Sequence, residues 1–244
     1  RGVVLAGILL LFVMVPQVMP GTLVNVFSKA MVFGVVALSM NILIGYAGQV
    51  SLGHQAFVGV GAFTSAFLLD KLALPWIVAV IGSIALGAFI SLGLGAVALR
   101  VKGLYFALVT IAYGVFVQAT VFGITSLTGG GAGANAPRPA FATGDIAYAY
   151  VCVAALLIAW AFDWRLTSSR PGRAIEALRD DERVAASWGI NVTGYKLLAF
   201  ALAGGVAGLG GALFASIEQI VSPLTFGLPL ALTFVLMTVA GGLR

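Results

Sequence analysis

A group of uncharged polar side chains lies within an otherwise apolar part of the chain. It consists of Asn41, Tyr46, Gln49, Ser51, His54 and Gln55. Burying so many hydrogen-bonding groups in lipid is unfavourable unless they pair with one another or meet water. A lone histidine is more often structural than a ligand, so the prediction rests on the whole group. We expect it to face the bundle interior or a translocation path for a polar solute, and the candidates for that path are Asn41, Gln49, Ser51, His54 and Gln55.

Charged groups are concentrated in a second segment, between Asp163 and Arg183. It holds ten charged residues, in a chain with only 13 Lys or Arg and 8 Asp or Glu. Apolar runs flank it on both sides. A membrane protein that gathers its charges of both signs into one loop can use that loop to contact a soluble partner.

We predict a single helix from about Arg173 to Trp188 in this charged segment. Pro171 suits the first position of a helix, Gly189 would end it, and Thr193 is placed to cap the next one. Apolar residues recur at helical spacing on one side of the predicted helix. We expect that side to dock on a partner, although a solvated helix that merely connects two spans is the alternative. The candidate contact residues are Arg173, Glu176, Leu178, Arg179, Asp180, Ala185, Trp188 and Gly189.

Catalytic and metal-binding patterns are missing from the sequence. There is no G-x-x-x-x-G-K-[ST] phosphate loop, and Gly-Lys does not occur anywhere in the chain. One His and one Cys cannot form a conventional zinc site. We therefore predict no catalytic residue, no metal ligand and no cofactor on this chain, and do not expect an enzyme.

The composition places the chain in a membrane. It is 61% apolar and 9% charged, against roughly 25% charged residues in a soluble domain. Runs of about 20 apolar residues are long enough to cross a bilayer as helices. The predicted fold is an all-α, polytopic membrane helical bundle with about eight spanning segments and one cytoplasmic coupling helix. The apolar segments are roughly 2–20, 30–47, 50–69, 74–99, 103–123, 146–162, 195–216 and 228–243.

The first of these segments, 2–20, has an alternative interpretation as a cleaved signal peptide. A membrane span is favoured because no small-x-small cleavage site precedes Gly21. Cytoplasmic loops of membrane proteins are enriched in Lys and Arg. With 165–193 in the cytoplasm, ten cations lie inside and three outside, namely Lys29, Lys71 and Arg138. The loop 124–145 is then external.

Glycine is unusually frequent, with 32 residues in the chain. It clusters around 45–61 and 204–211. Small residues allow spanning helices to approach closely, but they also permit broken helices that line a cavity. Both interpretations remain open.

The apolar segments contain no Asp, Glu, Lys or Arg well inside them. Carriers driven by ion gradients usually need such a group at depth, so this absence disfavours a gradient-driven carrier. A channel that acts alone would not account for the charged segment. A membrane scaffold without transport activity would not account for the polar group.

Four ordered blocks of sequence resemble a known family. Asn41–Phe63, which reads NILIGYAGQVSLGHQAFVGVGAF, closely resembles the signature of permeases from ABC importers of branched-chain amino acids. The other blocks resemble the M-type subunit of those importers; they are Arg100–Gly114, Leu127–Gly133, and Gly172–Glu182 continued by Gly189–Phe200. The stretch Ala185–Gly189 is similar to the E-A-A-x-x-x-G pattern of coupling loops, with Val184 in place of the Glu.

The resemblance implies an H-type permease partner, two cytoplasmic ATP-binding subunits that hold the ATP, and an external solute-binding protein. It implies branched-chain amino acids as substrates, but the same family also serves urea, short amides, and other amino or aromatic acids. Residues 1–244 would form a single permease domain in the bacterial plasma membrane. We expect the domain to be incomplete at both ends, because the family normally continues past Gly241–Gly242.

Overall fold

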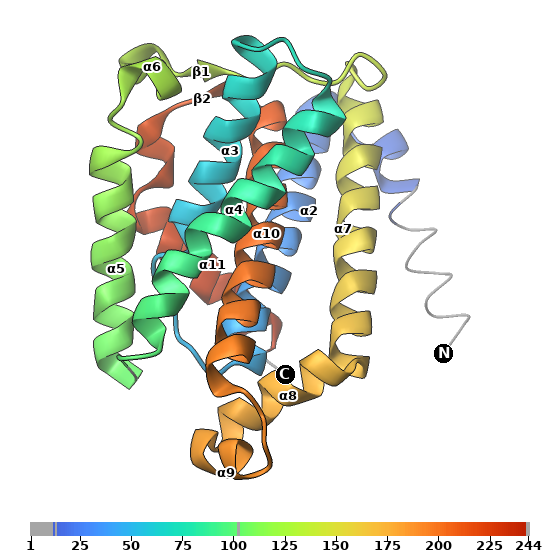
Figure 1. Cartoon of the computed structure of the whole chain (residues 1–244). Coiled ribbons are helices and arrows are strands. Elements are labelled where there is room, and N and C mark those ends of the chain that lie inside the picture. Colours follow the sequence, from blue (N-terminus) through green and yellow to red (C-terminus); the bar gives the residue numbers. More distant parts are fainter. Residues whose placement is uncertain (1–11, 13, 102, 243–244) are drawn as a thin grey trace.

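The computed structural model describes residue 12 and the ranges 14–101 and 103–242. Long helices form a bundle around α10 (Figure 1). Five of the helical stretches in this part of the chain are long and apolar enough to cross a membrane. They are α2 (Gly21–Asn41) with its continuation η1 (Ile42–Tyr46), α4 (Trp76–Ala98), α5 (Gly103–Thr120), α7 (Asp145–Ser168) and α10 (Val192–Glu218).

Two further apolar helices are shorter: α3 (His54–Asp70) has 17 residues and α11 (Leu228–Gly241) has 14. The all-α, polytopic class is therefore confirmed, whereas the count of about eight spans stays a prediction. Most of the predicted segment 2–20 lies outside the described residues. Two predicted boundaries were wrong. Helix α2 already begins at Gly21, so Lys29 lies within it and pairs with Glu218 at 2.6 Å, and α7 continues past 162 to include Asp163.

The two loops on which the predicted orientation depends lie at opposite ends of the bundle. The segment 124–145 contains α6 (Thr125–Thr128), the 3-10 turn η2 (Gly130–Ala132) and β1 (Ala134–Asn135). At the other end are α8 (Arg170–Asp180) and α9 (Glu182–Ser187) (Figure 1). The structure separates the two loops as the predicted topology requires, and the cytoplasmic placement of α8 and α9 stays a prediction.

Glycines bring α10 very close to its neighbours. A Cβ added at Gly211 would lie 2.0 Å from the carbonyl oxygen of Val58, and one at Gly61 would lie 2.3 Å from that of Gly208. Such spacing leaves no room for any side chain, so backbones pack directly against each other. The Ser83 hydroxyl donates to the Gly61 carbonyl at 2.8 Å, which adds a hydrogen bond between α4 and α3. For these glycines the packing interpretation is confirmed.

Replacing Gly211 with Ala should therefore destabilise the bundle. The new methyl group would force α10 away from α3, and overpacking of this kind costs about 1–3 kcal/mol. A matched control is Gly93→Ala on α4, because a Cβ at Gly93 meets nothing within 4 Å. Thermal unfolding of both purified variants in detergent gives the comparison, and equal melting temperatures would contradict this role of Gly211.

Arg138 holds the end of the bundle opposite α8 and α9. Its guanidinium donates to Asp145 at 2.6 Å, to the backbone oxygen of Ser216 at 3.3 Å and to Asn25 at 3.2 Å. It therefore joins the loop before α7 to α2, α7 and α10. Beside it, β1 pairs antiparallel with β2 (Ile220–Val221), and the 3-10 turn η3 (Pro223–Phe226) leads into α11. The sequence placed Arg138 at this end but contained no sign that it connects three helices.

Candidate functional site

The polar group lies at a break between two helices, α2 and α3, which run in opposite directions through the bundle (Figure 1). Helix α2 runs into the π-helical turn η1, an irregular segment follows over 47–53, and α3 begins at His54. The end of the break that leads into α3 is deep in the bundle, because a Cβ at Gly53 would lie 2.2 Å from the backbone oxygen of Thr110, midway along α5. Irregular backbone at membrane depth is tolerated where it is buried in protein or lines a cavity. The sequence predicted only a short joint between two spans here.

The structure buries four of the five translocation-path candidates. Ser51, His54 and Gln55 are at most 1% exposed, Gln49 is 9% exposed, and Asn41 is half-buried at the end of α2. The prediction that the group faces the bundle interior is confirmed for these residues. Their role in a translocation path stays a prediction.

Some of these polar groups have partners and others do not. Nε2 of His54 is hydrogen-bonded to the Ser39 hydroxyl of α2. The Ser51 hydroxyl, Nδ1 of His54 and both amide atoms of Gln55 are buried, and none has a hydrogen-bond partner among the described residues. Buried polar groups in proteins are nearly always hydrogen-bonded, so these unpartnered groups are candidates for contact with a polar solute.

Two residues that the sequence analysis did not assign to the site support the break. The backbone N–H of Leu52 donates to the Thr110 hydroxyl at 2.9 Å, which ties the irregular segment to α5. The Tyr46 hydroxyl donates to the carboxylate of Asp163 at 2.8 and 3.0 Å, which ties η1 to α7. Neither Thr110 nor Asp163 could be paired with its partner from sequence spacing, since each contact joins segments that are far apart.

The charged segment forms two helices, not the predicted single one. Helix α8 ends at Asp180, and the Asp181 side chain accepts from the N–H groups of Arg183 and Val184 as the N-cap of α9. Asp is a preferred N-cap residue, so the sequence contained the signal for this break.

Three smaller predictions about the charged segment can also be checked. Pro171 does lie in the first turn of α8, and Gly189 has a positive φ of 80°, as expected of a glycine that ends a helix. The predicted cap of the following span was wrong. Asn191, not Thr193, caps α10, and its side chain accepts from the Gly194 N–H.

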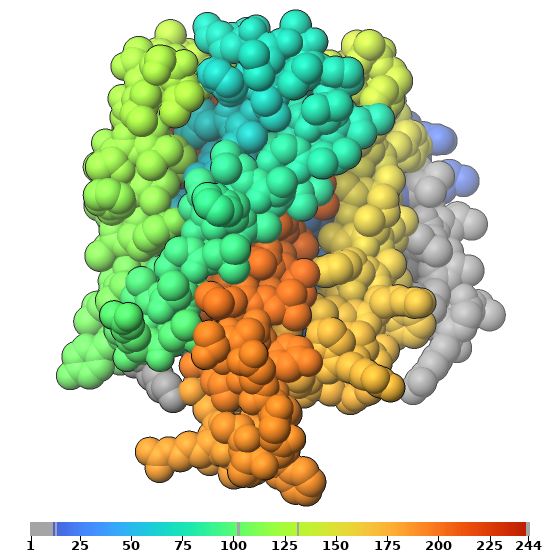
Figure 2. Space-filling view, in the orientation of Figure 1, coloured from blue at the N-terminus to red at the C-terminus, as the bar shows by residue number. Residues whose placement is uncertain are grey.

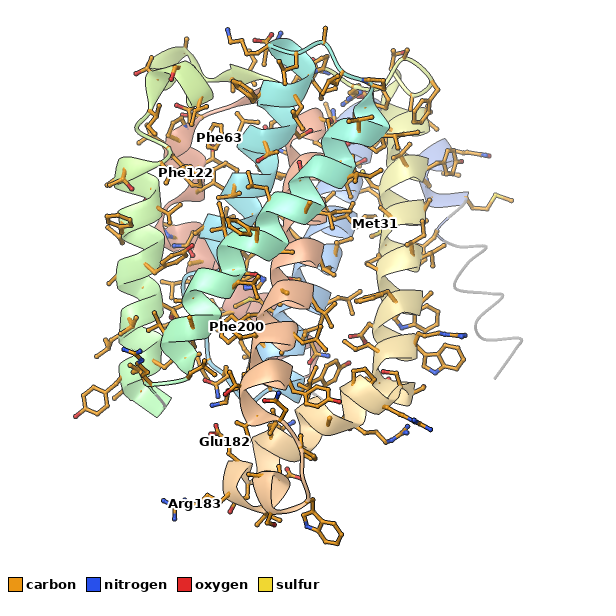
Figure 3. All side chains as sticks on the ribbon, viewed as in Figure 1. Met31, Phe63, Phe122, Glu182, Arg183 and Phe200 are labelled. Carbon is orange, nitrogen blue, oxygen red and sulfur yellow. The ribbon has the colours of Figure 1, made fainter. Side chains whose placement is uncertain are left out.

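The residues on the predicted apolar docking side are partly buried within this chain and partly exposed to solvent. Leu178 and Ala185 are buried within the chain, at 4% and 3% exposure, although Ala185 also lines a surface cleft. Contact of these two residues with a partner stays a prediction. Trp188 is 82% exposed. The segment of α8 and α9 projects from the bundle (Figure 2), and Arg183 points away from it (Figure 3). A cleft of about 350 Å³ between the two helices is lined by Val184 and Trp188, with Asp180 and Asp181 at its edge.

Helix α8 also contacts η1, the continuation of α2, directly. Nη1 of Arg179 donates to the carbonyl oxygen of Gly45 in η1. The aliphatic part of Arg179 packs on Gly48, where an added Cβ would lie 3.5 Å from the Arg179 Cβ. A buried ion pair of 2.5 Å between Lys196 and Glu182 joins α9 to α10. The segment formed by α8 and α9 is therefore connected both to η1, which leads into the break, and to α10.

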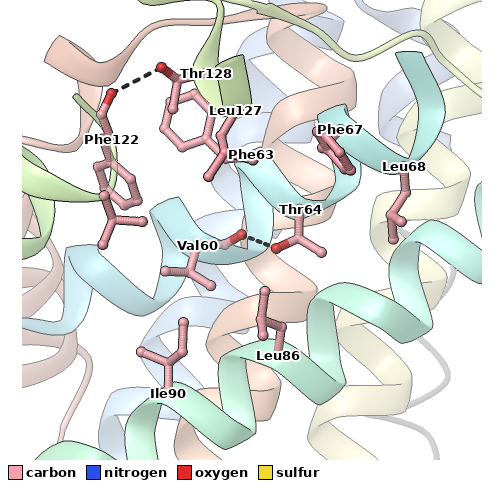
Figure 4. Close-up of a pocket in the computed structure, with 11 residues that line it drawn as sticks. Val60, Phe63, Thr64, Phe67, Leu68, Leu86, Ile90, Phe122, Leu127 and Thr128 are labelled. Carbon is pink, nitrogen blue, oxygen red and sulfur yellow. Dashed lines mark hydrogen bonds between the residues drawn. The ribbon is translucent and has the colours of Figure 1, made fainter. Parts of the chain in front are cut away.

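An apolar cavity of about 280 Å³ lies between α3, α4 and the segment 121–128 that follows α5 (Figure 4). Val60, Phe63 and Leu86 are among its lining residues. The hydroxyls of Thr64 and Thr128 donate to backbone oxygens, at 2.7 Å to Val60 and 3.0 Å to Phe122. The lining is thus suited to hydrocarbon and not to a charged group.

Comparison with known proteins identifies relatives of this chain. Residues 22–244 match a family described as "Branched-chain amino acid transport system / permease component". The chain is 27% identical to the high-affinity branched-chain amino acid transport system permease protein LivM of Salmonella typhimurium, over 90% of this chain and 58% of that protein. It is 28% identical to LivM of Escherichia coli, over 98% of this chain and 63% of that protein. The chain thus spans less than two thirds of each relative. No solved structure matches it.

Proposed function

Because this chain belongs to the family of permease components of branched-chain amino acid transport systems, we propose that it forms part of the translocation path of an ATP-driven importer for branched-chain amino acids. It is a multi-pass protein of the bacterial inner membrane. The chain contributes the path and leaves ATP hydrolysis to other subunits. Its partners would be an H-type permease subunit, two ATP-binding subunits and an external solute-binding protein.

One observation carries this proposal: α8, in the segment that projects from the bundle, contacts η1, which leads into the irregular segment beside the polar group. Arg179 of α8 bonds to Gly45 of η1. A channel acting alone has no use for such a link, whereas an importer powered from outside the membrane requires one. The mixed charges and the cleft between α8 and α9 provide a surface for the ATP-binding subunit.

The same contact suggests how ATP would drive transport. Closure of the paired ATP-binding subunits would move α8 and α9, and Arg179 would carry that movement to η1 and the break at 47–53. A conformational change requires contacts that differ between two states. The irregular backbone at 47–53 is where the two arrangements would differ.

Reconstitution in proteoliposomes tests the proposal. The full set of subunits should import labelled leucine only when ATP is present on the side of α8 and α9. Leaving out either the ATP-binding subunits or the solute-binding protein should abolish uptake. Uptake driven by a proton or sodium gradient without ATP would contradict the proposal and favour a carrier.

A further inference from the structure

The start of α3 is a buried helix N-terminus without a side-chain cap. Its N-cap residue is Gly53, which has no side chain to accept from the first-turn N–H groups. Gly53, His54 and Gln55 are all buried. The first N–H groups of a helix lack partners one turn earlier in the helix, and they carry the positive end of its dipole. In α3 the Ala56 N–H is bonded to the Gly53 carbonyl at 3.0 Å, so the donors available for a ligand are the N–H groups of Gly53, His54 and Gln55. A helix of 17 residues that begins in this way inside a bundle is suited to bind an anion.

Two residues close to Gly53 in the sequence have unpartnered polar side chains. The Ser51 hydroxyl is completely buried, and the Gln55 amide belongs to a residue that is 1% exposed; neither has a partner among the described residues. A Cβ placed on Gly114 of α5 would lie 2.4 Å from Nε2 of Gln55 and 3.2 Å from Cα of Gly53. The amide is therefore held beside the start of α3 and does not extend away from it.

These groups match one chemical class of ligand. The backbone N–H groups, the Ser51 hydroxyl and Nε2 of Gln55 are hydrogen-bond donors, which suit the two oxygens of a carboxylate. Oε1 of Gln55 is an acceptor that suits an ammonium group. We propose that the start of α3 binds the α-carboxylate of the transported solute, with Ser51 and Gln55 as direct ligands and Oε1 of Gln55 facing its ammonium group.

This inference rests on the proposed function and narrows it. Among the substrates that the family serves, it selects amino acids over urea and short amides, which carry no anionic group. The apolar cavity between α3, α4 and the segment 121–128 is a separate feature and is not needed for this assignment.

Two substitutions at Gln55 test the inference in the reconstituted transporter. Gln55→Met removes both polar atoms at similar length, and it should lower leucine uptake about tenfold because hydrogen bonds to charged groups are the strong ones. Gln55→Glu should lower uptake further at about pH 8, because a carboxylate would then face a carboxylate. At about pH 5 its uptake should recover relative to the wild type, because a buried Glu that faces a second carboxylate takes up a proton more readily than a free Glu does, and protonated Glu again offers a donor.

The matched control is Gln118→Glu on α5, where Nε2 lies 3.5 Å from the Pro223 oxygen, away from the start of α3. It should keep near wild-type uptake at both pH values. Unchanged uptake and unchanged KM in Gln55→Met would overturn the inference. ATP-dependent import of urea or acetamide in place of leucine by the wild type would also overturn it while leaving the permease function intact. No ATP-dependent import at all would remove the proposed function and the inference together.

Discussion

Trp188→Asp should release the ATP-binding subunits from the assembled transporter while the permease stays folded in the membrane. Trp188 is 82% exposed and lines the cleft between α8 and α9, so its substitution disturbs no packing inside the chain. Buried tryptophans at interfaces commonly contribute about 2 kcal/mol or more, which corresponds to roughly 30-fold in affinity. A carboxylate placed against an apolar surface weakens the interface further.

Co-purification of the ATP-binding subunits with the tagged permease measures this release, and leucine uptake should fall in parallel. Tyr105→Asp is the matched control, because Tyr105 is also a highly exposed aromatic residue, 76% exposed, at the start of α5 and apart from α8 and α9. Leu178→Asp is unsuitable as a test of this interface, because Leu178 is buried within the chain and its loss would detach α8 from the bundle. Full retention of the ATP-binding subunits by Trp188→Asp would show that the segment is only a connector.

Arg179→Cys should separate ATP hydrolysis from transport. The substitution removes the hydrogen bond from Arg179 to the Gly45 carbonyl, and bonds from charged donors contribute about 1.5–3 kcal/mol. We expect leucine uptake to fall more than tenfold, a change of about 1.4 kcal/mol or more. The ATP-binding subunits should stay attached and should continue to hydrolyse ATP, because the cleft between α8 and α9 is unchanged.

A disulfide offers a rescue that a merely structural role would not predict. A Cβ at position 48 would lie 3.5 Å from the Arg179 Cβ, within the range of about 3.5–4.5 Å for disulfide-bonded cysteines. Oxidation of the double variant Gly48→Cys with Arg179→Cys should restore uptake, and reduction should abolish it again. The native Cys152 is buried and is best replaced by Ala.

Gly48→Ala is the necessary control for the disulfide experiment. Gly48 has a φ of 64°, a conformation that costs most side chains about 1–2 kcal/mol. The uptake of the Gly48→Ala variant is the highest uptake to be expected of the cross-linked transporter. Normal uptake by Arg179→Cys would exclude the contact between Arg179 and Gly45 as the connection between α8 and η1. So would a failure of cross-linking to restore uptake, provided that Gly48→Ala transports normally.

Local signals in the charged segment explain which of its features the sequence revealed. Pro171 and Gly189 act through their own backbone preferences, so their places at a helix start and a helix end could be predicted. Asp181 is equally local, but it was counted among the charges of one helix, and its side chain caps a second one. The burial of Leu178 could not be read from spacing, because an apolar stripe does not indicate whether its own chain or a partner covers it.

For the polar group, too, the sequence predicted burial but not the contacting residues. Its enrichment in an apolar region correctly predicted burial in the bundle, because no other environment satisfies so many hydrogen-bonding groups. Its partners depend on contacts between distant parts of the chain: Ser39 for His54, Thr110 for Leu52 and Asp163 for Tyr46. A single sequence contains no information about which distant residue fills each position.

The contacts of Arg138 would make the start of α7 the fixed point of any tilt of that helix. It fixes the start of α7 to α2 and α10, while the far end of α7 runs into α8. A rod of 24 residues is about 36 Å long, so a tilt of about 5° around the fixed end moves the other end by about 3 Å. In such a tilt the displacement of α7 would decrease steadily from its α8 end toward Arg138. A movement driven by ATP at one face of the membrane would then produce almost no displacement of α7 at the opposite face.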